Sequence, residues 1–136
     1  EFGSVHVSEL MFVEKYSHVS HIVSNILGTL SPGISFLDIL RAIFPGGTIT
    51  GCPKIRCMEI IDELESSSRG PYSGSFGYIG WSRHMDLNII IRTIIVKNHK
   101  ASFHVGAGIV ADSDPEKEYN ETLAKAAAMI EVLGVC

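Results

Sequence analysis

The stretch that decides the fold is residues 74–111, GSFGYIGWSRHMDLNIIIRTIIVKNHKASFHVGAGIVA. It contains three apolar runs with the composition of β-strands. The runs are residues 74–82, 87–97 and 100–111, and the last two are joined by Asn98-His99, a short polar hairpin signal. Turns this short join strands in antiparallel order. The stretch therefore predicts an antiparallel sheet.

Helices and one further strand are predicted on either side of this sheet. A capping box of Ser35 with Asp38 starts one helix, and a second begins at Pro53. The predicted elements are a strand over residues 9–14, a helix over 17–27 with Val19, Ile22, Val23 and Ile26 inward, helices over 35–44 and from Pro53 to about 66–68, and a helix from Pro115 to Leu133 closing on Gly134. This order indicates an α+β class, with helices packed on an antiparallel sheet.

Length and composition limit the classes of protein. A chain of 136 residues is the size of one domain, and a formal charge of -4 leaves no basic surface for a nucleic acid. No apolar run is long enough to predict a membrane span. Cys52, Cys57 and Cys136 lack metal-ligand spacing and predict a reducing, cytoplasmic setting. Residues 1–4 are expected to be cloning-derived and residues 5–136 to be the domain.

Residues 46–62, GGTITGCPKIRCMEIID, place a glycine- and threonine-rich turn directly before a predicted helix. Glycines let a ligand approach the backbone, and the hydroxyls of Thr48 and Thr50 add donors. The free N–H groups at the start of the helix favour an anionic ligand. An ordinary glycine-rich loop fits the residues equally well. A phosphate-binding P-loop is excluded, because Cys52-Pro53 stands where that motif requires Lys followed by Ser or Thr.

Arg92 lies in a run from Leu87 to Val96 that is largely apolar on both faces. We expect such a strand to be covered on both sides, which would bury the guanidinium. An unpaired buried charge is costly, so an anion is expected to meet it. The partner is either an internal Asp or Glu or a ligand carboxylate, because the planar fork of Arg binds a carboxylate at two points.

Glu118, Glu121 and Lys125 share one face of the last predicted helix, because they are three and four residues apart. Two carboxylates at this spacing can hold a magnesium ion that keeps several waters. The same pattern also fits solvated glutamates that pair with Lys125. The residues alone favour the solvated alternative.

The segment Gly106-Ala107-Gly108 has a spacing that suggests a dinucleotide-binding turn. That interpretation is rejected, because the next helix begins only near Pro115 and no second strand follows to carry a ribose-binding acid. The glycines could instead relieve crowding where strands pack closely.

Three motifs resemble the family of chorismate-utilising enzymes. They are the glycine- and threonine-rich turn, the strand Asp-x-x-Ile-x-Ile-Arg-Thr at Asp86–Thr93, and Glu-x-x-Glu-Thr at Glu118–Thr122. The resemblance covers about Leu10 to Leu133 and looks like the C-terminal half of the chorismate-binding domain. It implies half of a layered α/β/β/α fold, chorismate as substrate, Mg²⁺, and ammonia from a glutamine amidotransferase subunit or domain.

The resemblance also implies roles for individual residues. An arginine and the backbone N–H groups of a glycine-rich turn bind carboxylates of chorismate, a tyrosine hydroxyl lies near the substrate, and a histidine faces its ring in an electrostatic or acid–base role. Glutamates bind the metal, with a lysine close by. The expected substrate-binding residues are Arg92, Tyr72, Gly106, Ala107 and Gly108, the metal ligands are Glu118 and Glu121, and the catalytic residues are His21, Thr48 and Lys125.

Within the family, Gly77-Tyr78-Ile79 and Met85–Ile89 are most similar to the large subunit of aminodeoxychorismate synthase. Anthranilate synthase is the alternative, and the Pro-Ile-x-Gly-Thr motif that separates the two does not occur in this sequence. A non-catalytic binding or assembly module that keeps the motifs is a third interpretation. We expect the chain to be inactive alone and, with 46% apolar residues, to self-associate.

Overall fold

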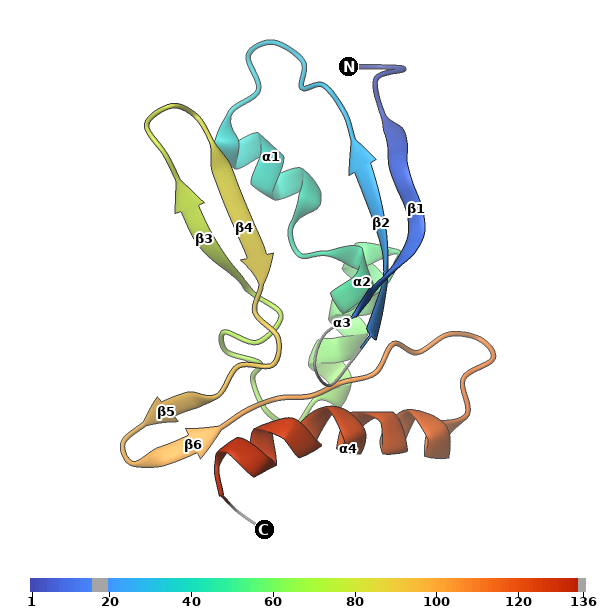
Figure 1. Cartoon of the computed structure of the whole chain (residues 1–136), viewed down its shortest axis with the longest axis vertical. Coiled ribbons are helices and arrows are strands. Elements are labelled where there is room, and N and C mark those ends of the chain that lie inside the picture. The colour runs from blue at the N-terminus through green and yellow to red at the C-terminus, as the bar shows by residue number, and fades with distance from the viewer. Residues whose placement is uncertain (16–19, 135–136) are drawn as a thin grey trace. The chain divides into compact units, whose positions relative to one another are not determined.

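The structure is a computed structural model and describes residues 1–15 and 20–134. It is an α+β protein whose strands form antiparallel pairs, as the sequence predicts (Figure 1). The chain divides into two compact units, residues 1–43 and 44–136.

The first unit is a β-hairpin followed by a helix. Strand β1 (His6–Lys15) pairs antiparallel with β2 (Ser20–Leu27), in a register that runs from His6 opposite Leu27 to Lys15 opposite Ser20. Helix α1 (Phe36–Ile43) follows. The predicted strand over residues 9–14 is therefore confirmed and extends further at its N-terminal end.

The helix predicted over residues 17–27 is wrong, because residues 20–27 form strand β2. Val19 lies outside the described residues. Ile22, Val23 and Ile26 fit a helical period, but a run this short also fits a strand. Their β-branched side chains favour extended backbone, and the neighbouring β1 supplies a ladder of backbone hydrogen bonds.

The capping box of α1 is confirmed. The carboxylate of Asp38 accepts hydrogen bonds from the backbone N–H of Ser35 at 3.0 Å and from its hydroxyl at 2.5 Å, and the backbone N–H of Asp38 donates to Ser35 Oγ at 3.3 Å. These hydrogen bonds from Ser35 lower the pKa of Asp38. The reciprocal contacts fix the start of the helix.

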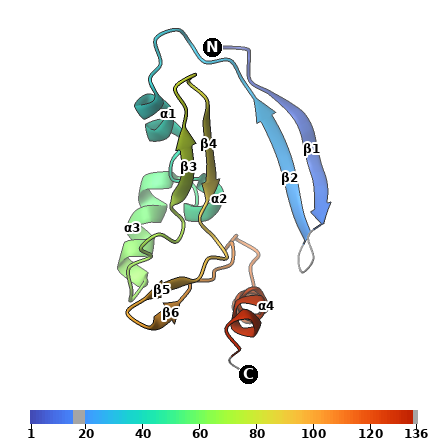
Figure 2. The same ribbon diagram turned by 60° about the vertical axis from the view of Figure 1, so that its left-hand side comes forward.

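Within residues 44–134, which the structure describes, the second unit contains three helices and two further hairpins. Helices α2 (Gly47–Thr50) and α3 (Lys54–Leu64) precede the hairpin of β3 (Ser75–Ile79) with β4 (Met85–Ile89). Strands β5 (Ile95–Lys97) and β6 (Lys100–Ser102) form the next hairpin, and helix α4 (Pro115–Val132) ends the described chain. The three hairpins are separate two-stranded sheets rather than one ladder. Residues 103–110 run beside α4 in both views (Figures 1 and 2).

All three predicted strands are shorter in the structure. Only Ser75–Ile79 of the run over residues 74–82 form a strand. The run over residues 87–97 breaks after Ile89, and only residues 100–102 of the run over 100–111 form a strand. Arg92 adopts a φ of 51°, a left-handed conformation that departs from the extended backbone of a strand. The Asn98-His99 turn is confirmed, with φ of 52° and 59° at its two residues. Two positive φ values suit a type I′ turn, whose twist matches that of the paired strands.

Few residues of the described chain are buried. Ala126 and Met129 on α4 are each 6% exposed, and Ser73 is 8% exposed. Tyr119, Leu123 and Ile130, at helical spacing from Ala126 on α4, are exposed. No helix among residues 1–15 and 20–134 is both long and apolar enough to cross a membrane. Because Ala126 and Met129 are its buried residues, helix α4 packs through a narrow strip of small and flexible side chains.

The start of α4 provides a test of helix stability. Asp114 caps the helix, because its side chain accepts a 3.0 Å hydrogen bond from the backbone N–H of Lys117. We expect Asp114→Ala to lower the free energy of unfolding by about 1 kcal/mol, the usual cost of losing an N-cap. Asp112→Ala is the matched control at an exposed acidic position outside the helix. Urea unfolding measures both, and equal losses would contradict the capping role.

Candidate functional site

The glycine- and threonine-rich turn is more helical than the sequence predicts. Residues 47–50 form the short helix α2, and the backbone N–H groups of Ile49 and Thr50 both donate to the Gly46 carbonyl, at 3.0 and 3.2 Å. Thr48 is exposed on this helix. Gly51 has a φ of 96°, and a Cβ there would lie 2.8 Å from Cys57 Sγ. Only glycine fits at this position between α2 and α3.

Tyr72 lies on a turn that follows α3. Its backbone N–H donates to the Arg69 carbonyl at 3.0 Å, and its ring stacks on His104 with the centroids 5.3 Å apart and the planes 16° apart. The guanidinium of Arg69 lies 5.6 Å from the centroid of the same ring. The Tyr72 ring therefore contacts both a cation and a second aromatic ring.

Arg69 also forms an ion pair with Glu65. Arg69 Nε donates to both carboxylate oxygens of Glu65 at 3.0 and 2.9 Å, and Nη2 donates to Oε1 at 2.5 Å. Hydrogen bonds from Arg69 lower the pKa of Glu65 and the same bonds raise the pKa of Arg69, while partial burial opposes both shifts. Because the folded-state pKa of Glu65 is depressed, this pair contributes stability above the ordinary glutamate pKa and loses it as the pH falls through the folded value.

Lys125 connects α4 to the Gly106 turn. Its Nζ donates to the Gly106 carbonyl at 3.0 Å and lies 2.5 Å from Glu121 Oε1. A Cβ at Gly106 would lie 3.1 Å from the hydroxyl oxygen of Tyr72, so the Tyr72 hydroxyl approaches this glycine closely. The structure therefore brings four predicted site residues together: Tyr72, Gly106, Glu121 and Lys125.

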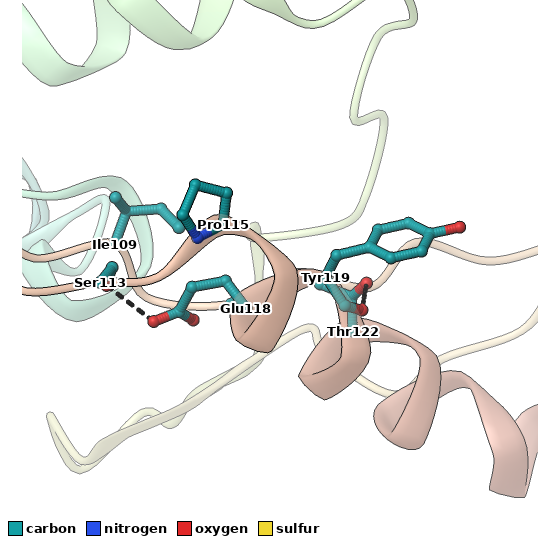
Figure 3. Close-up of a pocket in the computed structure, with 7 residues that line it drawn as sticks. Ile109, Ser113, Pro115, Glu118, Tyr119 and Thr122 are labelled. Carbon is teal, nitrogen blue, oxygen red and sulfur yellow. Dashed lines mark hydrogen bonds between the residues drawn. The ribbon is translucent and has the colours of Figure 1, made fainter.

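Glu118 borders a cavity of about 330 Å³ beside the start of α4 (Figure 3). Its Oε1 accepts a 2.7 Å hydrogen bond from the hydroxyl of Ser113. The cavity is lined by Ala107, Ile109, Ser113, Pro115, Glu118, Tyr119 and Thr122. The predicted substrate-binding residue Ala107 and the predicted metal ligand Glu118 thus share one cavity, which is largely apolar with a carboxylate on its wall.

Glu118 and Glu121 are the two metal ligands that the family resemblance predicts. Glu118 accepts from Ser113, and Glu121 pairs with Lys125, so both carboxylates have protein partners. No group of three or more His, Cys, Asp or Glu residues gathers within residues 1–15 and 20–134. A magnesium ion prefers a few carboxylate oxygens and keeps its waters, so Glu118 and Glu121 fit a partial coordination shell.

The expected burial of Arg92 is wrong. The side chain is exposed, and it forms no ion pair with any residue of the described chain. The cause is the break in the strand: the backbone N–H of Ile90 still donates to Gly74 at 2.9 Å, but the chain then turns away at Arg92. An internal acidic partner is thus not found among the described residues, and the guanidinium is free to meet an anion from outside them.

His21 lies on strand β2 opposite Glu14, in the first unit. The sequence predicts this histidine on a helix, and its position on a strand corrects that placement. The other predicted site residues belong to the second unit.

Sequence reasoning missed the residues that hold Tyr72. It assigns no role to His104 and does not single out Arg69 or Glu65. The spacing of four residues between Glu65 and Arg69 is the signal that predicts an ion pair at the end of a helix. The stacking of His104 had no local signal, because 32 residues separate it from Tyr72 in the sequence.

Comparisons with known proteins agree with the motifs. A family described as chorismate binding enzyme matches residues 1–131. The chain is 54% identical over 132 residues to an anthranilate synthase component I-like protein of Synechocystis sp. and 53% identical over 132 residues to aminodeoxychorismate synthase component 1 of Bacillus subtilis. Both matches cover 97% of the chain but only 27% and 28% of the two relatives. The chain thus spans about a quarter of the length of these relatives.

Solved structures share the fold. Anthranilate synthase component I from Streptococcus pneumoniae aligns with a TM-score of 0.84 at 47% identity, covering 93% of this chain and 29% of that one. A Bacillus anthracis protein provisionally named a 2,3-dihydroxybenzoate-specific isochorismate synthase aligns with a TM-score of 0.87 at 28% identity, covering 98% of this chain and 36% of that one. The fold and the motifs therefore point to the same group of proteins.

Proposed function

Because the chain belongs to the family of chorismate binding enzymes, we propose that it is part of the chorismate-aminating subunit of aminodeoxychorismate synthase. The observation that supports this most directly is 53% identity over 132 residues to a relative with that name. The segments Gly77-Tyr78-Ile79 and Met85–Ile89 favour the same assignment. In the proposed reaction ammonia attacks the chorismate ring with loss of a ring hydroxyl, and aminodeoxychorismate forms.

Anthranilate synthase component I is the second candidate. A relative of that name in Synechocystis sp. is 53% identical over 136 residues, which equals the identity to the aminodeoxychorismate synthase. Both reactions replace a ring hydroxyl of chorismate with an amino group, but they place it at different ring carbons, and only the anthranilate reaction then eliminates pyruvate. The substrate site proposed below serves either reaction.

The residues of the second unit suit the recognition of a dicarboxylic ring compound. The exposed guanidinium of Arg92 can bind one carboxylate at two points. The backbone N–H groups at Gly106, Ala107 and Gly108 can bind another, with the Tyr72 hydroxyl above Gly106. Lys125 is held by Glu121 and the Gly106 carbonyl, so its ammonium lies beside the same turn. These groups bind and orient the substrate before the ring reacts.

Further assignments of a metal, catalytic residues, an ammonia source and a compartment complete the proposal. Mg²⁺ bound by Glu118 and Glu121 would neutralise charge on the substrate. His21 would act on the ring as an acid, a base or an electrostatic partner, and Thr48 would contribute its hydroxyl. A glutamine amidotransferase would supply ammonia, and we place the enzyme in the cytoplasm.

The test uses the full-length parent protein with chorismate, ammonium and magnesium. Mass spectrometry identifies the aminated product, and a coupled assay measures pyruvate. Aminodeoxychorismate without pyruvate supports the proposal, whereas anthranilate with one pyruvate per turnover supports the second candidate. Saturable binding of chorismate without turnover would support a non-catalytic module instead.

The chain by itself is expected to be inactive and to self-associate. Two carboxylates form an incomplete metal shell, so chorismate should not turn over at a detectable rate. Each described sheet has only two strands and leaves open edges, and Phe76 and Trp81 are 73% and 106% exposed. Open edges and exposed apolar side chains favour association between copies.

Light scattering measures this association. The double variant Phe76→Lys and Trp81→Lys should lower the apparent mass at equal concentration. The control Ser82→Lys adds a charge at a neighbouring exposed position without removing apolar surface. A monomeric chain that forms an aminated product would contradict both parts of the prediction.

A further inference from the structure

Arg69 and His104 contact the Tyr72 ring, and Glu65 holds Arg69; we call Glu65, Arg69 and His104 the tyrosine clamp. They come from the end of α3, the turn after it and the segment that follows β6. None of the three belongs to the substrate or metal sites proposed above. The clamp is thus a set of charged and aromatic groups without an assigned role.

Arg69 is the central residue of the clamp. Its guanidinium uses Nε and Nη2 for the Glu65 carboxylate and Nη1 for the Ser73 hydroxyl at 3.0 Å. Its side chain is 23% exposed, and Ser73 is among the few buried residues of the described chain. A guanidinium bound at two points is fixed in position and orientation. Arg69 therefore presents a fixed cation beside the Tyr72 ring.

His104 also contacts the Tyr72 ring. The two rings are nearly parallel, and the Nδ1 atom of His104 is buried without a hydrogen-bond partner among the described residues. A buried ring nitrogen without a partner is unfavourable, so packing must hold His104 where it is. The stack on Tyr72 is the contact that the structure shows for it.

The clamp determines where the Tyr72 hydroxyl lies. No residue of the described chain forms a hydrogen bond with this hydroxyl, which lies close above Gly106. The carbonyl of Gly106 is engaged by Lys125. The hydroxyl is therefore fixed at the predicted carboxylate-binding turn and keeps its donor for a ligand.

We propose that Arg69 and His104 are positioning residues that fix the Tyr72 hydroxyl for hydrogen bonding to a carboxylate of the substrate at Gly106. The inference rests on the proposed function, because the carboxylate is that of chorismate. Glu65 acts through Arg69, since it holds the guanidinium. Neither Arg69 nor His104 contacts the substrate. Their effect passes entirely through the position of one hydroxyl.

A double-mutant cycle in the full-length parent enzyme tests this inference. Arg69→Ala is expected to raise the KM for chorismate about tenfold, because a small displacement of a binding group has a large effect. Tyr72→Phe removes the hydroxyl and keeps the ring. In the Tyr72→Phe background, Arg69→Ala should change KM less than about twofold, because the group that it positions is already gone.

Rescue and control variants separate positioning from general destabilisation. His104→Phe keeps a ring to stack on Tyr72 and should retain a near-normal KM, whereas His104→Ala should raise it. Arg56→Ala is the control for loss of an arginine that pairs with carboxylates, because Arg56 bonds Glu59 and Glu63 on the exposed surface of α3. Arg56→Ala should leave KM unchanged. If Arg69→Ala does not fold, the comparison of His104→Ala with His104→Phe provides the same test.

The outcomes distinguish this inference from the proposed function. A wild-type parent that does not transform chorismate overturns the proposed function, and the inference with it. An active wild type in which the Arg69 and Tyr72 effects simply add overturns the inference alone. Equal KM values for His104→Ala and His104→Phe also overturn the inference alone. A tenfold effect of Arg69→Ala that disappears with Tyr72→Phe supports it.

Discussion

Replacing Glu118 and Glu121 together by Gln is expected to reduce magnesium-dependent turnover of the full-length enzyme by about 100-fold or more. Metal ions supply several kcal/mol to reactions of charged substrates, and each 1.4 kcal/mol is about tenfold in rate. Gln keeps the length and helix propensity of Glu but is a poor ligand for magnesium. The measurement is turnover as a function of magnesium concentration.

The structure predicts that this double variant still folds. The amide that replaces the Glu118 carboxylate keeps an oxygen, which can accept the hydrogen bond that the Ser113 hydroxyl donates. The ion pair of Glu121 with Lys125 is partly exposed, and pairs of this kind contribute about 0.2–1 kcal/mol. The loss of turnover should therefore come from the metal site rather than from unfolding, and far-UV circular dichroism checks this.

A matched pair of substitutions on the same helix is the control. Glu116→Gln with Glu131→Gln removes two exposed acidic groups from α4 and should leave the response to magnesium unchanged. An unchanged half-saturating magnesium concentration in the Glu118 and Glu121 variant would show that these two glutamates are ordinary surface carboxylates.

The helices follow from local signals in the sequence. The Ser35 and Asp38 capping box, Pro53 and Pro115 mark helix starts that the structure keeps within one residue. Each signal acts through contacts within one turn, so a single sequence is enough to predict it. The Asn98-His99 turn is local in the same sense. These elements are predictable because no distant residue decides them.

The elements that the sequence predicts wrongly depend on distant contacts. Residues 20–27 form a strand because β1 pairs with them, and a short apolar run cannot by itself separate a period of 3.6 from a period of 2. The strand ending at Ile89 stops because Arg92 takes a left-handed backbone. Its isoleucines have a strong strand preference, which this backbone overrides locally.

The candidate site likewise contains some contacts that the sequence predicts and others that depend on distant residues. The motifs predict that Tyr72, Gly106, Glu121 and Lys125 belong to one site, and the structure brings these four residues together. The stack of His104 on Tyr72 arises only when β5 and β6 return the chain to the turn after α3. Neither the composition nor the residue spacing of the sequence predicts such a contact.

Arg92→Ala is expected to raise the KM for chorismate in the full-length enzyme by about 10- to 100-fold. A hydrogen bond to a charged group contributes about 1.5–3 kcal/mol, and each 1.4 kcal/mol is about tenfold in affinity. Arg92 is exposed and has no ion-pair partner in the described chain, so the variant leaves no buried carboxylate of these residues unpaired. Truncating one partner of a buried charge pair costs roughly 2–5 kcal/mol of binding free energy. The loss of binding free energy in Arg92→Ala should therefore fall below the upper end of this range.

Two matched variants sharpen this prediction. Arg92→Lys keeps the charge but loses the planar fork, so it should restore only part of the affinity. Arg83→Ala is the control, because Arg83 is also exposed and has a similar left-handed backbone, with φ of 66° against 51° at Arg92. Any effect of placing alanine at such a backbone is therefore common to both variants. A KM that rises equally in Arg83→Ala and Arg92→Ala would assign the effect to the backbone and remove Arg92 from the carboxylate site.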